Sequence, residues 1–516
     1  MAKSLMVMGT SSNVGKSILC TALCRIFVQD GYSVAPFKSQ NMSLNSAVTP
    51  TGREIGRAQA VQADACGIPA NEHMNPVLLK PTRHNESQVI LQGRVYQTKS
   101  ARAYFLERMG EIWDAVVESF QYLNLRHELL VIEGAGSPVE MNLKSKEIAN
   151  MRTAELADAD VLLVADIDRG GIFAAVVGTL QLLTEHERAR VKGIIVNKFR
   201  GDRSLFDDGV HLLEEYTGIP VLGVIPHIPD LGIEEEDSVA LDEERYRLSK
   251  RNDEQPNMVH IAVVQLPHIS NFTDFDPLFL DPGVHAYFCR KPDDIGHAHA
   301  IILPGSKNTI DDMRWLRQSG FVEEITQKHR QGTVVFGVCG GYQMLGQEVR
   351  DPSGQESNDP ICSGLDLLPV VTTLQSEKTT VLVQGQLEGI FASIPVSGYE
   401  IHMGQSVGDN GYQPFSTVRT VPDGELRLDG AMNSAGTVMG TYLHGIFDND
   451  VFRQQWLNQI RDRVGLVAPM TPDWSMTTTR SEAFDRLASI VRQHMNMDVL
   501  YQIPGFMPKR AEGVSC

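Results

Sequence analysis

The sequence predicts an α/β protein with two domains, each built on a doubly wound parallel sheet. Residues 1–233 alternate short, almost continuous apolar runs with helical stretches, which is the pattern of buried parallel strands. A second series of such runs begins at residue 258. Between the two series lie residues 234–257, whose high charge predicts a linker. A chain of 516 residues is long enough for two or three domains.

The expected strands are the β-branched apolar runs within each domain. In the first domain (residues 1–233) they lie at residues 5–8, 33–36, 129–132, 161–165, 193–196 and 221–224. In the second domain (residues 258–450) they lie at residues 259–264, 300–303, 333–338, 379–383 and 437–442. We expect residues 451–516 to form a helical extension that packs on the second domain and ends in a frayed tail.

The composition argues against several classes of protein. The net charge of −18 disfavours nucleic acid as a partner, and no stretch approaches the ~18 apolar residues of a membrane helix. The first residues lack the basic and apolar layout of a signal peptide. Seven scattered cysteines suit a reducing cytoplasm. We therefore expect a cytoplasmic protein without a nucleic-acid or membrane partner, and the sequence leaves its oligomeric state open.

A phosphate-binding loop follows the first predicted strand. Residues 9–17 are rich in glycine, end in Lys-Ser and lead directly into an apolar-periodic helix. This context is what a P-loop requires, because backbone N–H groups and a helix N-terminus cradle phosphate oxygens. Lys16 would reach the terminal phosphates of ATP, and Ser17 would hold Mg²⁺. The expected nucleotide contacts are Gly9, Thr10, Asn13, Val14, Gly15, Lys16 and Ser17.

The spacing of this loop departs from the commonest motif. Five residues, not four, separate Gly9 from Gly15, which argues against the commonest P-loop ATPases and motors. The spacing resembles that of the dethiobiotin synthetase subgroup. Asn197, which follows the strand at 193–196, resembles the base-recognition position of that subgroup and joins the predicted nucleotide contacts. Asparagine is also an ordinary residue at the end of a strand.

Two carboxylates are candidates for further Mg²⁺ ligands beside Ser17. Glu133 follows a predicted strand and begins a Gly-Ala-Gly turn, at the edge where open α/β sheets bind ligands. Its alternative interpretation is a capping or surface carboxylate. Glu54 is the weaker candidate.

Polar residues beyond predicted strands are candidates for substrate contacts. A dense polar run at residues 40–45 follows the strand at 33–36, although a hydrogen-bonded turn would have a similar composition. Two aspartates end the strand at 161–165 on the same side of the sheet. An anionic substrate would also need local basic groups in this acidic chain. The predicted substrate contacts are Gln40, Asn41, Ser43, Asn45, Lys80, Asp166 and Asp168.

The sequence around Cys339 predicts a second chemical centre. The strand at 333–338 is followed by Cys339, two glycines and a helix, which is a nucleophile elbow with cysteine in place of serine. Small neighbours are needed because the backbone at such a nucleophile is strained. The N–H of Gly340 and a second donor at Gly305, in the turn after the strand at 300–303, would stabilise an oxyanion.

A cysteine nucleophile needs a base, and His444 is the best candidate among the fifteen histidines. It follows the predicted strand at 437–442. His402, in a segment flanked by glycines, is the second candidate. A lone cysteine or histidine is usually structural, so the prediction depends on the elbow and the histidine together.

Both segments resemble the class I glutamine amidotransferase family. Residues 337–343 resemble its nucleophile motif, and His444 matches its histidine. The resemblance implies a flavodoxin-like sheet and hydrolysis of L-glutamine through a thioester on Cys339, with release of ammonia. The family usually has a glutamate two residues after the histidine, where this chain has Ile446. The third member of the triad stays open between the nearby Asp448 and a backbone group.

The chain from about residue 4 to 490 resembles the cobyric acid synthase family. The resemblance is carried by residues 38–46, 54–59, 74–81, 131–138, 166–171 and 304–309. It implies ATP- and glutamine-dependent amidation of the b, d, e and g carboxylates of a corrinoid acid, adenosylcobyrinic acid a,c-diamide. The product is adenosylcobyric acid, in cobalamin biosynthesis. A carboxylate is a poor electrophile, and its phosphorylation gives an acyl phosphate that ammonia can attack. This need for ATP explains why a P-loop and a glutaminase would occur in one chain.

Other activities remain open at this point. Cobyrinic acid a,c-diamide synthase and CTP synthase are also glutamine-dependent P-loop amidoligases. A partitioning-type ATPase usually has an additional lysine early in its P-loop, where this chain has Thr10 and Ser11. The last alternative is a cysteine hydrolase with a regulatory nucleotide site. Residues 40–46 and 75–81 favour the cobyric acid synthase family.

Overall fold

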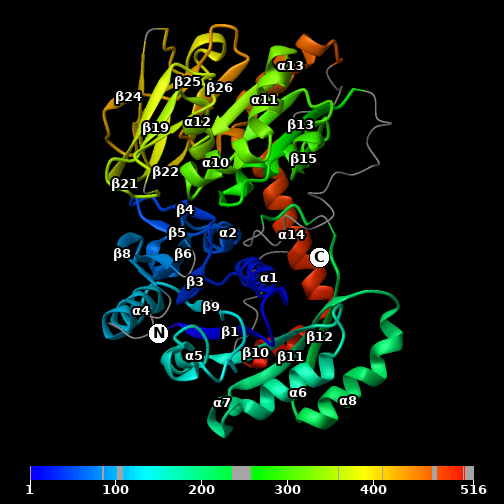
Figure 1. Cartoon of the computed structure of the whole chain (residues 1–516). Coiled ribbons are helices and arrows are strands. Elements are labelled where there is room, and N and C mark those ends of the chain that lie inside the picture. The colour runs from blue at the N-terminus through cyan, green and yellow to red at the C-terminus, as the bar shows by residue number, and fades with distance from the viewer. Residues whose placement is uncertain are drawn as a thin grey trace. The chain divides into compact units, whose positions relative to one another are not determined.

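The computed structural model describes residues 2–83, 86–100, 109–229, 231–234, 257–357, 359–409, 411–467, 474–503 and 505. Its helices and strands are labelled in Figure 1. The chain folds into two units: the first contains Met1–Ser43, Glu54–Ile233 and Arg480–Cys516, and the second contains Leu44–Arg53 and Glu234–Thr479. The linker expected at residues 234–257 lies outside the described residues except at its two ends.

The centre of the first unit is a parallel sheet of six strands in the order β12-β11-β10-β1-β9-β2. The six strands predicted for this region are confirmed. Because all of them run in the same direction, their carboxyl ends meet at one edge of the sheet. Their bounds are β1 (Lys3–Gly9), β2 (Val34–Phe37), β9 (Leu129–Glu133), β10 (Asp160–Asp166), β11 (Val191–Phe199) and β12 (Val221–Pro226).

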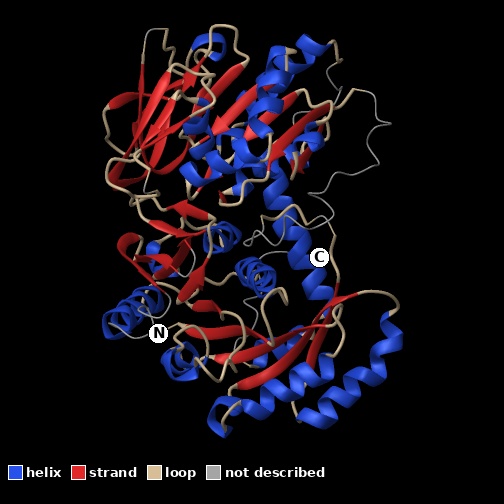
Figure 2. Cartoon of the chain, in the orientation of Figure 1, coloured by secondary structure: helices blue, strands red, loops and turns tan. Residues whose placement is uncertain are grey.

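Alternate residues of these strands point to opposite faces of the sheet, and each face has its own apolar core. Met6, Ile132 and Leu163 pack on one face against α4 (Met109–Asn124), α5 (Met151–Leu156), α6 (Ile172–Leu182) and α8 (Asp207–Thr217). Leu5 and Val131 pack on the other face against α1 (Lys16–Gln29) and α2 (Arg57–Ala65). Helices on both faces make the sheet doubly wound, as predicted (Figure 2).

The C-terminal helices α14 (Met476–His494) and α15 (Met497–Gln502) complete the second of these cores. From Arg480 on, the chain belongs to the first unit. Phe484, Leu487 and Val491 form an apolar stripe at helical spacing that packs in the same core as Leu222 of β12. The prediction that this extension packs on the second domain is therefore wrong from Arg480 on. A frayed tail was expected at the end of residues 451–516, and the end of the chain from residue 506 on lies outside the described residues.

A smaller sheet of the first unit was not predicted from the sequence. Its strands lie in the order β3-β6-β7-β8. The parallel pair β3–β6 sets Gln40 opposite Val77 and Met42 opposite Leu79, so this sheet fixes the start of the polar run. The remaining elements of this unit are β3 (Gln40–Met42), β5 (Glu54–Gly56), η1 (Glu72–Met74), β6 (Val77–Arg83), β7 (Glu86–Leu91), β8 (Arg94–Ser100), η2 (Lys144–Lys146), α7 (Glu185–Ala189) and η3 (Arg203–Phe206).

The second unit is built on a sheet in the order β15-β13-β16-β18-β26-β25, parallel except at the β25–β26 pair. The strands are β13 (Val259–Val264), β15 (Val284–Cys289), β16 (Ala300–Leu303), β18 (Val334–Val338), β25 (Ala431–Met432) and β26 (Val438–Thr441). Helices α9 (Asp276–Leu280), α10 (Thr309–Gln318), α11 (Phe321–Arg330), α12 (Gly340–Leu345) and α13 (Asp450–Val464) accompany it. This α/β architecture agrees with the prediction.

A second, mostly antiparallel sheet of this unit contains β19 (Glu348–Arg350), β20 (Ile361–Ser363), β21 (Val370–Leu387), β22 (Pro395–Gly408), β23 (Ser416–Thr420) and β24 (Leu426–Asp429). The strand expected at 379–383 is part of the long β21, which pairs with β22. The short strand β4 (Ser46–Val48) lies beside β21 and β22, as Figure 1 shows. The short elements are β14 (Ile269–Ser270), β17 (Gly305–Ser306), η6 (Phe272–Phe275), η7 (Pro292–Ile295), η8 (Gly389–Phe391) and η9 (Ile446–Asp448).

Within the described part of the chain, every helix is too short or too polar to cross a membrane.

Candidate active sites

The glycine-rich loop joins β1 to α1 in the first unit. Gly15 has φ 96° and Asn13 has φ 59°, so both take the left-handed conformation that a tight phosphate loop needs. A Cβ on Gly9 would lie 2.7 Å from Val14 Cγ2, so only glycine fits there. The Lys16 ammonium donates to the carbonyls of Ser11 (3.0 Å) and Gly136 (3.2 Å). The loop is thus closed around its own lysine.

Two residues at the end of β11 brace this loop. The Asn197 amide donates to the Val14 carbonyl at 2.8 Å, and the Lys198 ammonium donates to the Asn13 carbonyl at 2.6 Å. A Cβ on Gly15 would lie 2.2 Å from Asn197 Nδ2. Asn197 therefore contacts the nucleotide loop itself, in addition to any role in reading a base.

Ser17 and Glu133, two of the predicted metal ligands, lie within hydrogen-bond distance of each other. The Ser17 hydroxyl donates to Glu133 Oε1 at 2.8 Å. The Lys38 ammonium donates to the same oxygen at 2.8 Å, and the Gln62 amide donates to Oε2 at 2.6 Å. Burial alone would raise the pKa of Glu133, but the charge of Lys38 and these three hydrogen bonds lower it. Glu133 is thus held as a buried anion, not as a surface carboxylate.

Oxygen donors of this kind suit Mg²⁺, which binds through one or two carboxylates together with substrate phosphates and water. Among the described residues, no group of three or more His, Cys, Asp and Glu side chains could hold a metal ion. Ser17 and Glu133 would supply the few protein ligands that Mg²⁺ commonly uses.

The other predicted ligand, Glu54, lies in a buried ion pair with Lys80, with 2.7 Å between Oε1 and Nζ. Both residues were singled out from the sequence, for different roles, and the structure brings them together. Asp166 pairs with Lys198 at 3.3 Å, and Asp168 pairs with Arg200 at 2.9 Å.

The polar run at residues 40–45 divides between the two units. Asn41 donates to Gln59 Oε1 of α2 at 3.0 Å, and the Ser43 N–H donates to the Leu79 carbonyl of β6 at 3.1 Å. These contacts lie in the first unit, as do those of Gln40 in β3. Asn45 belongs to the second unit. Asn45 therefore belongs to a different unit from the other three residues, and its contact with a substrate stays a prediction.

Cys339 lies between the carboxyl end of β18 and the first residue of α12, with φ 51° and ψ −109°. This strained backbone is the nucleophile elbow that the sequence predicts. A Cβ on Gly341 would lie 1.9 Å from the Leu303 carbonyl, and one on Gly340 would lie 2.8 Å from the N of Ser306. The glycines are therefore required by the close approach of the neighbouring β16–β17 segment.

His444 hydrogen-bonds to Cys339 and to the Asp274 carboxylate, with 2.6 Å between Nδ1 and Oδ2. The other oxygen of Asp274 accepts from the Gly445 N–H at 3.1 Å. Burial would lower the pKa of His444, but the charges of Asp274 and Cys339 outweigh it and raise this pKa to about 10. An imidazolium beside the cysteine sulfur is what stabilises a thiolate nucleophile.

The carboxylate that hydrogen-bonds to His444 is that of Asp274, and sequence reasoning missed it. The expected positions lay shortly after His444, but the carboxylate that orients the ring comes from η6, after β14. The available signal was a short run of mostly polar residues, 270–274, after the first strand of the second series. Such runs are common in loops, so this one did not stand out.

The predicted oxyanion donors lie next to the triad. Gly305 is in β17, and a Cβ there would lie 3.4 Å from Cε1 of His444. Gly340 follows Cys339 directly. The second histidine candidate, His402, is engaged elsewhere, since its Nε2 lies 3.2 Å from Glu400 Oε2 and its Nδ1 lies 2.7 Å from the Gly404 carbonyl.

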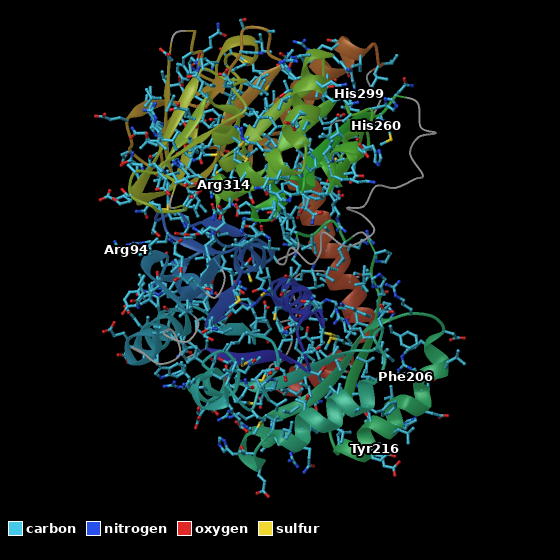
Figure 3. All side chains as sticks on the ribbon, in the orientation of Figure 1. Arg94, Phe206, Tyr216, His260, His299 and Arg314 are labelled. Carbon is cyan, nitrogen blue, oxygen red and sulfur yellow. The ribbon has the colours of Figure 1, made fainter. Side chains whose placement is uncertain are left out.

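Two other histidines of this unit, His260 and His299, contact each other with 5.4 Å between ring centroids (Figure 3). They lie at the amino ends of β13 and β16, whereas Cys339 lies at the carboxyl end of β18. Their position excludes them as the base for this cysteine.

Comparison with known proteins gives matches over both units. Residues 3–235 match the family model described as an AAA domain, and residues 260–452 match a CobB/CobQ-like glutamine amidotransferase domain. A cobyric acid synthase of Dehalococcoides mccartyi (strain CBDB1) is 48% identical over 98% of this chain and 99% of its own. One of Geobacillus sp. (strain WCH70) is 48% identical over 96% and 97%. One of Salmonella heidelberg (strain SL476) is 46% identical over 98% of both chains.

Proposed function

The chain belongs to the cobyric acid synthase family, and on that premise we propose how its residues divide the reaction. The protein is a ligase that amidates a corrinoid acid in cobalamin biosynthesis, with glutamine as the nitrogen donor. In the finer form of the proposal, it amidates the b, d, e and g carboxylates of adenosylcobyrinic acid a,c-diamide through acyl phosphates. The observation that carries it is that one chain holds both a phosphate cradle and a cysteine–histidine–aspartate triad.

The second unit supplies ammonia. The Cys339 sulfur attacks the side-chain amide of glutamine, and the His444 imidazolium gives its proton to the departing ammonia. Asp274 keeps the ring oriented and charged. The N–H groups of Gly340 and Gly305 stabilise the oxyanion in this proposal, which is supported by the position of Gly340 after Cys339 and of Gly305 near His444. Water then releases glutamate from the thioester.

The first unit activates the carboxylate. Lys16 and the loop from Gly9 to Ser17 hold the phosphates of ATP, and the substrate carboxylate attacks the γ-phosphate to give an acyl phosphate. Ser17 and Glu133 would hold Mg²⁺, which offsets charge on the transferred phosphoryl group when it is bound. We propose that Gln40, Asn41 and Ser43 contact the corrinoid acid, together with Lys80 of β6 and with Asp166 and Asp168 at the carboxyl end of β10.

The other activities considered above are less well supported. A partitioning-type ATPase has no use for the triad at Cys339. Cobyrinic acid a,c-diamide synthase and CTP synthase share the same chemistry, and the near full-length identity to cobyric acid synthases favours the chosen acceptor. We propose that Asn197, which donates to the Val14 carbonyl of the loop, also contacts the nucleotide base.

The test is acceptor-dependent ATP turnover by the full chain. With glutamine and Mg²⁺ present, we expect phosphate release only when cobyrinic acid a,c-diamide is added, and mass spectrometry should count up to four new amides. Lys16→Ala is the control that should lose turnover. ATP turnover that does not depend on the corrinoid acid, or that requires UTP as the acceptor, would contradict the proposal.

A further inference from the structure

The proposed oxyanion donor at Gly305 lies in β17, a strand of only two residues. β17 pairs antiparallel with the equally short β14, with Ser270 opposite Gly305. The two strands form a sheet of their own beside the six-stranded sheet of the second unit. A pair of strands with so few ladder hydrogen bonds is marginally stable by itself. Contacts from outside the pair are therefore needed to fix its position beside Cys339.

β17 runs close to the nucleophile elbow. A Cβ on Gly340 would lie 2.8 Å from the N of Ser306, and a Cβ on Gly305 would lie 3.4 Å from Cε1 of His444. An oxyanion donor works only within about 2.7–3.1 Å of the place where the oxyanion forms. A shift of β17 by a fraction of an ångström would weaken that hydrogen bond. Glutamine hydrolysis should therefore depend on whatever holds β17 in place.

The carboxylate of Asp312, in the first turn of α10, holds both strands of the pair. Its Oδ2 accepts from the Ser306 hydroxyl of β17 at 2.6 Å. Its Oδ1 accepts from the N–H of His268 at 3.2 Å and lies 2.8 Å from Nδ1 of the same residue. His268 directly precedes β14. One side chain thus joins β14 and β17 to α10.

Backbone hydrogen bonds complete this network. The N–H of Asn308 donates to the Ser306 hydroxyl oxygen at 3.0 Å, so this hydroxyl is fixed as donor and as acceptor. The N–H of Lys307 donates to the His268 carbonyl at 2.9 Å. Asn308 is also the N-cap residue of α10. The two strands and the start of the helix are therefore joined around Asp312.

The charges of the network favour this arrangement. Asp312 is completely buried, whereas the side chain of His268 is 37% exposed. The hydrogen bond to Asp312 raises the pKa of His268 against the effect of burial. A buried carboxylate is costly unless its hydrogen bonds are made, and bonds to an ionised partner are the stronger ones. Displacement of either strand would break such bonds and is resisted.

We propose that Asp312 is a positioning residue of the glutaminase, which fixes β17 and its oxyanion donor beside Cys339 through Ser306 and His268. This inference rests on the oxyanion role proposed above for Gly305. Asp312 acts through the backbone of β17 and is separate from the triad. Its replacement should therefore weaken binding of the tetrahedral intermediate and leave the reactivity of the Cys339 thiolate intact.

The test compares two reagents that use the same sulfur in the full chain. With glutamate γ-semialdehyde, the Cys339 thiolate bonds to the aldehyde carbon, and the C=O electron pair moves to the oxygen, which takes the oxyanion position. With iodoacetamide, the thiolate displaces iodide and no oxyanion forms. The inhibition constant of the semialdehyde therefore reports the oxyanion hole. The alkylation rate, read on the Cys339 peptide by mass spectrometry, reports the thiolate.

In Asp312→Asn we expect glutaminase kcat to fall about 10–100-fold, with KM for glutamine changed less than about threefold. The inhibition constant of the semialdehyde should rise by a similar factor, because the adduct resembles the transition state. Alkylation of Cys339 should stay within about twofold of the unaltered chain.

Asp311→Asn is the matched control and should leave all of these values unchanged. Asp311 lies in the same turn of α10 but pairs with Arg314 at 2.9 Å. Ser306→Ala removes a single bond of the network, so it should give the same pattern with a kcat loss of about three- to tenfold. This second variant keeps the test informative if Asp312→Asn fails to fold.

Three results would overturn the inference. Alkylation that falls as much as kcat would mean that Asp312 supports the whole elbow and not the oxyanion donor. An unchanged inhibition constant in both variants would overturn the inference alone and leave the proposed function standing. An unaltered chain that hydrolyses glutamine but is not inhibited by the semialdehyde would also overturn the proposed oxyanion hole.

Discussion

The two candidate sites share one geometry and differ in how the chain assembles it. The phosphate loop lies between β1 and α1, and Cys339 lies between β18 and α12. Both sites therefore use the carboxyl end of a parallel strand and the start of a helix. Nine consecutive residues, 9–17, supply most of the first site, whereas the triad comes from three separate segments. Contiguous sites can be recognised in a sequence, and dispersed ones only in part.

The sites also hold opposite charges. In the first unit Lys38 keeps the pKa of the buried Glu133 low, so an anion is held where a metal ion is expected to bind. In the second unit Asp274 and Cys339 raise the pKa of His444 to about 10 against the effect of burial. Each buried charge has its own partner, which is the condition for keeping it ionised. The two sites lie at similar sheet edges, and the buried charge at each edge suits a different reaction: a carboxylate for phosphoryl transfer and an imidazolium for thiol chemistry.

The largest expected effect comes from removing the negative charge of the triad. Asp274→Asn should lower glutaminase kcat by about 10³–10⁴-fold, because the ring loses the partner that orients it and stabilises its positive charge. Ammonia-supported amidation is the control and should continue. A loss below about tenfold in glutaminase kcat would show that Asp274 only packs beside the ring.

The same variant should move the pH profile. The raised pKa of His444 means that the imidazolium persists as pH rises and is lost near pH 10. Without Asp274, burial is the largest remaining influence and lowers this pKa, so the alkaline loss of glutaminase activity should begin at a lower pH. An unchanged alkaline limb in Asp274→Asn would contradict the assigned charge state.

Lys16→Ala tests the first site in the same way. Removal of this cation from the phosphate cradle should slow ATP-dependent amidation by about 10²–10³-fold, whether glutamine or ammonia supplies nitrogen. Basal glutaminase activity, measured without acceptor, should stay close to that of the unaltered chain. A parallel loss of basal glutaminase activity would mean that the two sites are not separate.

The sequence predicted the first sheet well because buried parallel strands are continuous apolar runs. It predicted Cys339 and His444 because the elbow glycines restrict what else that segment can be. It did not predict the packing of the C-terminal helix. The stripe of Phe484, Leu487 and Val491 shows that this helix buries one face, but it does not show which unit covers that face. It missed Asp274 because no spacing rule joins residue 274 to residue 444.

The interleaved units give a prediction on stability. Leu487 of α14 and Leu457 of α13 are buried leucines in helices of the first and second unit, respectively. Each change to alanine should cost about 2–5 kcal/mol. Hydrogen exchange should rise in β1 and β12 for Leu487→Ala, and in β18 and β26 for Leu457→Ala. Faster exchange in β18 from the α14 variant, with β12 unchanged, would contradict the assignment of α14.

The smallest expected effect distinguishes the two histidine candidates. His402→Gln keeps a donor toward Glu400 and should change glutaminase kcat by at most about tenfold, the worth of one hydrogen bond. The matching change His444→Gln should abolish the activity. Equal losses in the two variants would mean that His402 also takes part in the chemistry.

The central claim is that the second unit supplies ammonia and the first unit forms the amide, and Cys339→Ala tests it most directly. Cys362→Ala, which removes another cysteine of the second unit, is the control. Amidation of cobyrinic acid a,c-diamide is measured with glutamine and, separately, with an ammonium salt at alkaline pH. We predict that Cys339→Ala loses glutamine-supported amidation and keeps ammonia-supported amidation within about twofold of the unaltered chain. An equal loss with both nitrogen sources would contradict the account.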